Sequence, residues 1–227
     1  MTAEDSDRDH SDRRVDRERS ALVLVDLQPD FLPGGALPVK DGDAILSGIR
    51  ELMESDLFAV QVATQDWHPA DHVSFASNHE GGKPMDVIEL HGHAQTLWPD
   101  HCVQGTDGAE LHPDLPWESV SVIVRKGAAV DSDSYSGFRN NWNADGERPP
   151  TGLAGYLRER EIESLYLCGL ARDVCVKWTA EDGGDAGFEV RFLWDLTRSV
   201  DPSADDELAE DLEEQGVHVI ESGDLRA

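Results

Sequence analysis

Basic residues are scarce in this chain, and their scarcity limits what the protein can bind. The 227 residues include 19 lysines and arginines against 47 aspartates and glutamates, which gives a formal net charge of −28. Such a charge repels nucleic acid and anionic membranes, so we expect neither as a partner. Long apolar segments argue against disorder as the reason for the acidity. An acidic surface with only four lysines is typical of proteins adapted to high salt, which screens the repulsion.

Cysteine is also rare, and no apolar run approaches the length of a membrane span. The three cysteines, Cys102, Cys168 and Cys175, show no spacing of a disulfide framework, which favours a reducing compartment. The first twenty residues mix acids with arginines and lack the hydrophobic core of a signal peptide. We therefore predict a cytoplasmic protein with a disordered tail over residues 1–19 and one domain over residues 20–227. The sequence leaves the oligomeric state open, a homo-oligomer included.

Six apolar runs predict the strands of a buried, mostly parallel sheet. They cover residues 21–26, 57–64, 119–125, 164–169, 189–194 and 217–221. Near-continuous apolar strands imply a sheet that is covered on both faces. Helical spacing of apolar residues lies between several of them, over residues 45–53, 153–157 and 203–215. The alternation predicts an α/β fold, a three-layer αβα sandwich around a sheet of about six strands.

Three side chains that suit catalysis follow predicted strands. Asp26 ends the first strand, where partial desolvation favours its protonated form and suits it to proton transfer. Lys126 follows the third strand, and Cys175 follows the fourth at a turn whose N–H groups would lower the thiol pKa and hold an oxyanion. Each has an ordinary alternative, respectively a turn cap, a surface lysine and a buried structural cysteine. That last alternative fits Cys168, inside a strand, better than it fits Cys175.

The segment from residue 66 to residue 118 holds most of the nine histidines and is too long for an ordinary loop. Asp66 and His68 are two residues apart, so in extended backbone they point to the same side. With His101 they make a set of two imidazoles and a carboxylate that leaves positions for water and substrate. His72 is a further candidate ligand. The remaining histidines of the segment are better interpreted as surface residues.

Five separated segments together resemble the isochorismatase-like cysteine hydrolases, in the nicotinamidase/pyrazinamidase branch. In family order, they are DLQPDFLPGGALPV from Asp26, TQDWHPADHVSFASNH from Thr64, LWPDHCVQGTDGAELHPDL from Leu97, RKGAAVDSDSYSGF from Arg125 and GLARDVCVKWTA from Gly169. The resemblance runs from about residue 21 to residue 220. It favours the functional interpretation of the strand-end and histidine residues over the ordinary ones.

The resemblance implies a role for each matching position. The catalytic residues of the family fall on Asp26, Lys126 and Cys175. The other roles are the metal ligands Asp66, His68 and His101 with His72 as an additional ligand, the ring-binding aromatic residues Phe31 and Trp98, and the oxyanion-hole N–H groups of Ala171 and Cys175. The family also implies a cis peptide bond between Leu170 and Ala171.

The activity implied is hydrolysis of nicotinamide, and also of pyrazinamide, to the acid and ammonia through a cysteine thioester, a step of NAD salvage and pyridine nucleotide biosynthesis. The metal would be a divalent ion, zinc before manganese or iron. Two alternatives stay open, a related cysteine hydrolase of another small amide and a catalytically silent binding protein of the same fold. Arg172 departs from the family, which often has threonine there, and near a site entrance it could alter access or substrate range.

Overall fold

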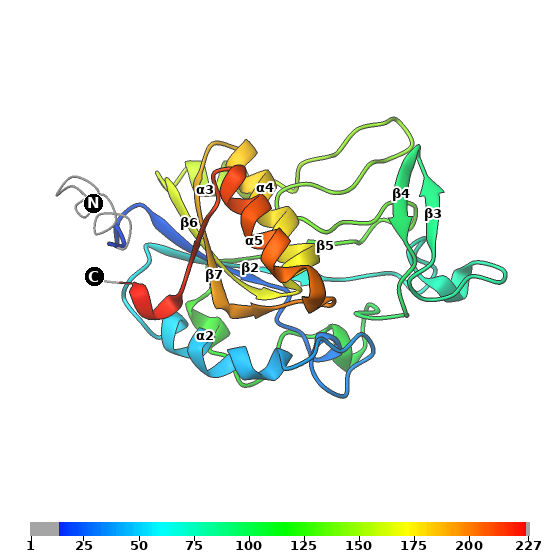
Figure 1. The fold of residues 1–227 in the computed structure, drawn as a ribbon, viewed down its shortest axis with the longest axis horizontal. Helices are drawn as coiled ribbons and strands as arrows, with labels where there is room; N and C mark the ends of the chain where they lie inside the picture. Colours follow the sequence, from blue (N-terminus) through cyan, green and yellow to red (C-terminus); the bar gives the residue numbers. More distant parts are fainter. Residues whose placement is uncertain (1–13, 226–227) are drawn as a thin grey trace.

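The computed structural model describes residues 14–225, and one parallel sheet forms its centre (Figure 1). The strand order is β5-β2-β1-β6-β7-β8, and every neighbouring pair in that sheet is parallel. The strands are β1 (Ser20–Val25), β2 (Val60–Asp66), β5 (Val122–Lys126), β6 (Ser164–Leu170), β7 (Glu189–Arg198) and β8 (His218–Ile220). All six predicted strands are present, with ends that differ by a few residues from the prediction.

Strand β1 shows why this sheet is buried on both faces. All six of its residues are buried, and successive side chains point to opposite sides of the sheet. Leu22 and Leu24 pack into one hydrophobic cluster, whereas Val23 and Val25 pack into the other. A strand of this kind needs apolar residues at every position, which is why its sequence lacks the alternation of a half-exposed strand.

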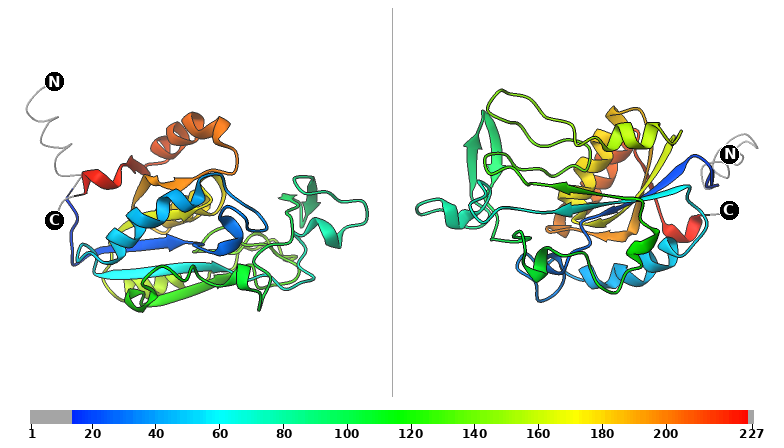
Figure 2. Two further views of the ribbon diagram at one scale, coloured as in Figure 1. Left: turned by 90° about the horizontal axis from the view of Figure 1, so that it is seen from below. Right: turned by 180° about the vertical axis from the view of Figure 1, so that it is seen from behind.

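Helices cover the two faces, so the protein is the predicted αβα sandwich (Figures 1 and 2). Helix α2 (Leu46–Met53) lies on one face and contributes Ile49 and Met53 to the first cluster. Helices α3 (Leu153–Arg158), α4 (Lys177–Asp185) and α5 (Asp205–Glu214) lie on the other face and contribute to the second cluster. None of the helices between residues 14 and 225 is long and apolar enough to cross a membrane.

Two parts of the chain add detail that the sequence patterns did not predict. The long segment after β2 contains an antiparallel hairpin, β3 (Val87–Leu90) and β4 (His93–Thr96), which projects beyond one end of the sheet (Figure 2). The predicted tail over residues 1–19 lies mostly outside the described residues. Within its described part, Val15 is 3% exposed and packs in the core, and Arg19 pairs with Glu163. The packed part of the chain therefore reaches back to Val15.

Candidate active site

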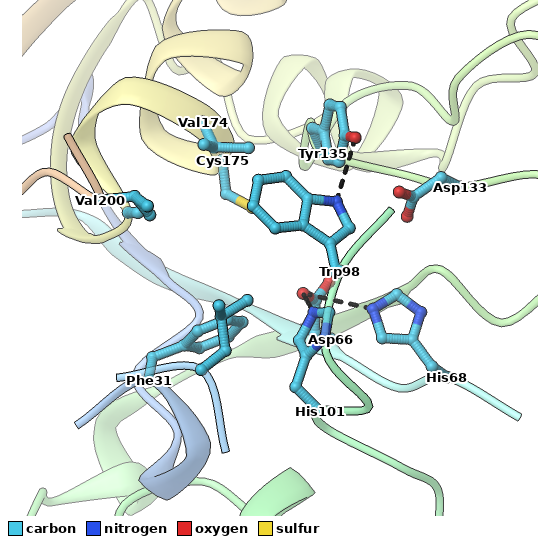
Figure 3. Close-up of a pocket in the computed structure, with 12 residues that line it drawn as sticks. Phe31, Asp66, His68, Trp98, His101, Asp133, Tyr135, Val174, Cys175 and Val200 are labelled. Atoms are coloured by element: carbon cyan, nitrogen blue, oxygen red, sulfur yellow. Dashed lines mark hydrogen bonds and ion pairs between the residues drawn. The ribbon is translucent and has the colours of Figure 1, made fainter. Parts of the chain in front are cut away.

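A pocket opens at the carboxyl ends of the central strands, where open α/β sheets usually bind ligands (Figure 3). Cys175 and Ala171 line it beyond the end of β6. Asp66, His68 and His101 line one side. The remaining lining residues are Phe31, Leu37, Trp98, Asp133, Tyr135, Val174 and Val200. The pocket therefore gathers residues from segments that are distant in the sequence, including most of those that were predicted to act.

Asp26 directly follows β1 and is fully buried. Its φ of 48° lies in the left-handed region, which non-glycine residues adopt mainly at turns and functional sites. The hydroxyl of Thr64 donates to Asp26 Oδ1 at 2.6 Å, and Oδ2 lies 2.8 Å from Lys126 Nζ. Apart from this ion pair, Oδ2 has no hydrogen-bond partner among the described residues. Burial raises the pKa of Asp26 to about 6, although Lys126 opposes the shift.

Lys126 ends β5 and joins the two halves of the site. Its ammonium group forms ion pairs with Asp26 and Asp66, donates to the carbonyl of Ser134 at 3.1 Å, and lies 3.3 Å from the sulfur of Cys175. Burial lowers the pKa of Lys126, but the two carboxylates outweigh burial and raise the pKa well above its ordinary value. The lysine is therefore a permanent cation, paired as a buried charge must be.

Cys175 lies in a short π-helical turn, residues Arg172–Val176, that leads from β6 into α4. Burial raises the pKa of its thiol well above the ordinary value, because the opposing effect of Lys126 is smaller. This shift is opposite to the lowering expected from the sequence. The resting group is a thiol, and carboxylate oxygens of Asp26 and Asp66 lie within 4.8 Å of its sulfur. The peptide bond between Leu170 and Ala171 is cis, as the resemblance implies.

Asp66, His68 and His101 form a set that fits a divalent metal. Their ligand atoms all lie within 4.8 Å of one another, and all three residues are buried. Nδ1 of His68 donates to the carbonyl of Gly127 at 2.9 Å, and Nδ1 of His101 donates to that of Pro99 at 2.7 Å. These bonds leave both Nε2 atoms facing Asp66 Oδ2, at 3.5 and 3.8 Å. Backbone carbonyls orient metal-binding histidines in this way in many proteins.

His72 lies beside this set rather than within it. Its ring is 4.3 Å from that of His68, measured between centroids. Its ligand atom groups with those of His68 and Asp133, not with that of His101. Burial lowers the pKa of His72 to about 4, so its imidazole is neutral, and both ring nitrogens form hydrogen bonds, Nδ1 with Ser74 at 2.7 Å and Nε2 with the carbonyl of Ser132 at 3.3 Å. The interpretation of His72 as an additional ligand remains a prediction.

Aromatic side chains form much of the pocket wall. Phe31 and Trp98 both line the pocket, as the resemblance implies, and the structure adds Tyr135. The indole N–H of Trp98 donates to the hydroxyl of Tyr135 at 3.2 Å (Figure 3). The side-chain amide of Gln95 donates to the same oxygen at 2.9 Å. Burial raises the pKa of Tyr135 well above 10, so its hydroxyl stays protonated. This part of the wall is therefore aromatic and held by hydrogen bonds.

Several residues that complete the site were not singled out from the sequence. Thr64, Asp133 and Tyr135 stand inside the matching segments, so a position-by-position comparison was the only signal for them. Gly127 is a different case. It has a φ of +64°, and a Cβ there would lie 2.2 Å from the His68 ring, so only glycine allows the ring its position.

Arg172 is not at the entrance, contrary to the expectation. It is 5% exposed and does not line the pocket. Its guanidinium group lies 3.7 Å above the ring of Trp194 and forms an ion pair with Asp205. The side chain points away from the pocket because β7 and α5 offer it carbonyl and carboxylate acceptors.

Comparison with known sequences gives matches over nearly the whole described chain. The profile of the isochorismatase domain matches residues 20–224. A nicotinamidase of Acinetobacter baylyi is 48% identical over 181 residues, which cover 80% of this chain and 82% of that protein. A nicotinamidase of Escherichia coli is 44% identical over 182 residues, covering 79% of this chain and 83% of that protein.

Solved structures of the same kind share the fold. An Acinetobacter baumanii nicotinamidase/pyrazinamidase superposes with a TM-score of 0.85 at 44% identity, covering 91% of this chain and 98% of that chain. An L. infantum protein in complex with nicotinate gives 0.82 at 40% identity, covering 94% and 98%. A Pyrococcus horikoshii pyrazinamidase in complex with zinc gives 0.73 at 36% identity, covering 89% and 99%.

Proposed function

This chain belongs to the isochorismatase family, and from that premise we propose that it hydrolyses nicotinamide to nicotinate and ammonia. The single observation that carries the proposal is the contact of Lys126 with both Asp26 and Cys175, directly beneath a pocket that Cys175 lines together with Asp66, His68 and His101. The first three supply a nucleophile with its base and a cation. The second three supply a site for the ring nitrogen. Pyrazinamide, which has a nitrogen at the same ring position, is an expected second substrate.

The first half of the reaction forms a thioester. Asp26 removes the thiol proton of Cys175, and Lys126 stabilises the thiolate. The sulfur attacks the carboxamide carbon, and the charge that develops on the oxygen is received by the N–H groups of Ala171 and Cys175. The C–N bond then breaks, the proton held by Asp26 goes to the nitrogen, and ammonia leaves.

The second half restores the enzyme. Asp26, a carboxylate again, removes a proton from a water molecule that attacks the thioester carbon. The C–S bond breaks, Asp26 passes its proton to the sulfur of Cys175, and the product leaves as nicotinic acid, which ionises to nicotinate. The pKa of Asp26, about 6, suits both directions of proton transfer near neutral pH.

We assign the metal site to zinc. Asp66, His68 and His101 would hold a divalent ion, which would supply a Lewis acid for the pyridine nitrogen, directly or through water, and so help to orient the ring. Zinc, manganese and iron all accept two imidazoles and a carboxylate, and the zinc complex of the Pyrococcus horikoshii pyrazinamidase supports zinc among them. Elemental analysis of the purified protein tests the assignment.

The decisive experiment compares substrates that differ at the ring nitrogen. Ammonia release is measured for nicotinamide, pyrazinamide and benzamide, with and without prior treatment with a chelator. We expect turnover of nicotinamide and pyrazinamide, weak or no turnover of benzamide, which lacks a ring nitrogen, and restoration of the chelated enzyme by added zinc. A protein that releases no ammonia from nicotinamide under any of these conditions contradicts the proposal.

We also propose that the protein is adapted to high salt. With a net charge of −28, carboxylates on the surface repel one another. Helix α5 carries acidic residues in its first turn and has no basic residue in its last turn. Screening by salt shortens the reach of that repulsion from about 10 Å at 0.1 M to about 3 Å at 1 M. The melting temperature measured against KCl concentration tests this adaptation.

A further inference from the structure

One wall of the pocket comes from outside the catalytic and metal segments. Val200, in the loop between β7 and α5, lines the pocket and packs against the first hydrophobic cluster. In Figure 3, Val200 and His68 face the pocket from opposite sides. The valine therefore lies where a ring held at the metal site would present its far edge.

The loop that carries Val200 is bound to the turn that carries Cys175. The carboxylate of Asp173 accepts hydrogen bonds from the backbone N–H of Val200 and from that of Asp201, both at 2.9 Å. Asp173 is two residues from the nucleophile. A single carboxylate thus fixes the backbone of the wall relative to the reacting sulfur.

Arg172, the neighbour of Asp173, holds the same segment from both ends. Its guanidinium donates to the carbonyls of Trp194 and Thr197 at 2.7 and 2.9 Å, and to the hydroxyl of Thr197 at 2.8 Å. It also pairs with Asp205, the first residue of α5. The contacts lie before and after the loop in the sequence, so Arg172 ties the end of β7 to the start of α5. Such a planar, fully bonded guanidinium is a rigid support that lysine could not reproduce.

We propose that Val200 determines which ring substituents this pocket accepts, and that Arg172 and Asp173 are positioning residues that hold it in place. The proposal rests on the proposed function, because it takes a pyridine carboxamide as the occupant. Neither positioning residue touches the pocket space. Their influence on selectivity passes through the backbone of the loop, which is the feature that an experiment can isolate.

The first experiment removes the wall. kcat/KM is measured for nicotinamide and for the four nicotinamides with one methyl group at ring carbon 2, 4, 5 or 6. We expect Val200→Ala to raise the ratio of at least one methylated amide to nicotinamide by about tenfold, which is what one methylene is worth in an apolar pocket. Val219→Ala is the matched control, a half-buried valine of β8 outside the pocket, and it should leave all four ratios unchanged.

The second experiment leaves Val200 in place and removes the side chains that hold its loop. Asp173→Ala and Arg172→Ala should shift the same ratio in the same direction as Val200→Ala, and Asp173→Asn, which keeps one acceptor, should shift it less. Arg191→Ala is the control, since Arg191 is also a buried arginine but lies near the start of β7, at the end opposite to the one that Arg172 contacts. Each ratio is internal to one variant, so a merely structural defect changes all five amides by one factor and leaves the ratios alone.

Three outcomes overturn the inference. Unchanged kcat/KM ratios in Val200→Ala show that Val200 does not limit which ring substituents the pocket accepts. A shift in Val200→Ala without a shift in Asp173→Ala or Arg172→Ala shows that the two residues position nothing. If the wild type turns over none of the five amides, the proposed function fails, and binding of nicotinate and its four methyl derivatives is measured by calorimetry instead. If the substitutions shift the affinity ratios of these acids as expected for the kcat/KM ratios, the role of Val200 is supported. If none of the five acids binds, the inference is wrong.

Discussion

Charged residues occupy two contrasting regions of this protein, the carboxyl edge of the sheet and the exposed surface of α5. At the sheet edge, Asp26, Asp66 and Lys126 are almost completely buried and paired with one another. On α5, the carboxylates are mostly exposed, and only the first, Asp205, is paired with a buried cation. Burial makes each charge at the edge depend on its neighbour, whereas solvent and salt determine what the charges of α5 do. The same side-chain types therefore perform chemistry in one region and set solution behaviour in the other.

The largest expected effect comes from the nucleophile at the buried edge. Cys175→Ala should abolish ammonia release from nicotinamide, because no other cysteine lies in the pocket. Cys102→Ala and Cys168→Ala are the controls and should leave measurable activity. Near-normal turnover by Cys175→Ala would show that the covalent mechanism is wrong.

The next effect tests whether the buried charges depend on one another. Lys126→Met should lower the free energy of unfolding by about 3–5 kcal/mol, because it leaves Asp26 and Asp66 without their cation. Lys83→Met, at an exposed lysine, is the matched control. The measurement is denaturant unfolding of both variants at pH 7. Equal stability of the two would mean that burial does not couple these charges.

Removal of a metal ligand should have a smaller effect. His68→Ala and His101→Ala should each lower the affinity for zinc by at least about tenfold and raise KM for nicotinamide, because the ring loses its orientation. His79→Ala is the control, a half-buried histidine whose Nε2 donates to the carbonyl of Val73. Metal content is measured by elemental analysis. Wild type and variants that all lack stoichiometric metal would remove this site.

The pH dependence of the reaction tests the buried carboxylate. The base must be ionised, so kcat/KM should rise with pH through about 6, the pKa to which burial raises Asp26. An ordinary aspartate would place the rise near 3.9. The stability of the fold should change in the opposite direction. Because the pKa of Asp26 is higher in the folded than in the unfolded protein, its protonation stabilises the fold at low pH, and this contribution is lost as the pH rises through about 6.

Thr64→Val sharpens the pH experiment. The hydroxyl of Thr64 donates to Asp26 and lowers its pKa, so the variant should move the rise in kcat/KM to higher pH. Asp26 is not the base if the rise in kcat/KM occurs at the same pH in Thr64→Val as in the wild type. The same conclusion follows if the rise lies near pH 4 in the wild type.

The smallest expected effect belongs to the exposed region. The melting temperature should rise between 0.1 M and 2 M KCl, by about 2–4 °C for each kcal/mol of repulsion relieved. Sucrose at matched osmolality is the control for general effects on apolar burial. Neutralising three exposed carboxylates of α5, with Asp206→Asn, Glu210→Gln and Glu214→Gln in one variant, should reduce the dependence on salt. A melting temperature that stays flat or falls with KCl would reject salt adaptation.

The sequence predicted well those features that arise within one segment. The six strands were predictable because burial on both faces requires apolar residues at every position, as in β1. Asp26, Lys126 and Cys175 were candidates because each lies at or shortly after the end of a strand, and the carboxyl ends of parallel strands meet at one edge. The matching segments then named the metal and ring-binding positions, of which Phe31, Trp98, Asp66, His68 and His101 line one pocket.

Tertiary structure alone decided the partners of these side chains. The thiol pKa of Cys175 rises rather than falls because burial outweighs the nearby cation, and burial depends on the whole site. Arg172 turns toward Trp194 and Asp205 because acceptors more than twenty residues away lie beside it. Val200 reaches the pocket through a carboxylate of another segment. Local sequence patterns predict the secondary structure and the faces of it that must be apolar. The partners and the desolvation of a side chain depend on distant segments that only folding brings together.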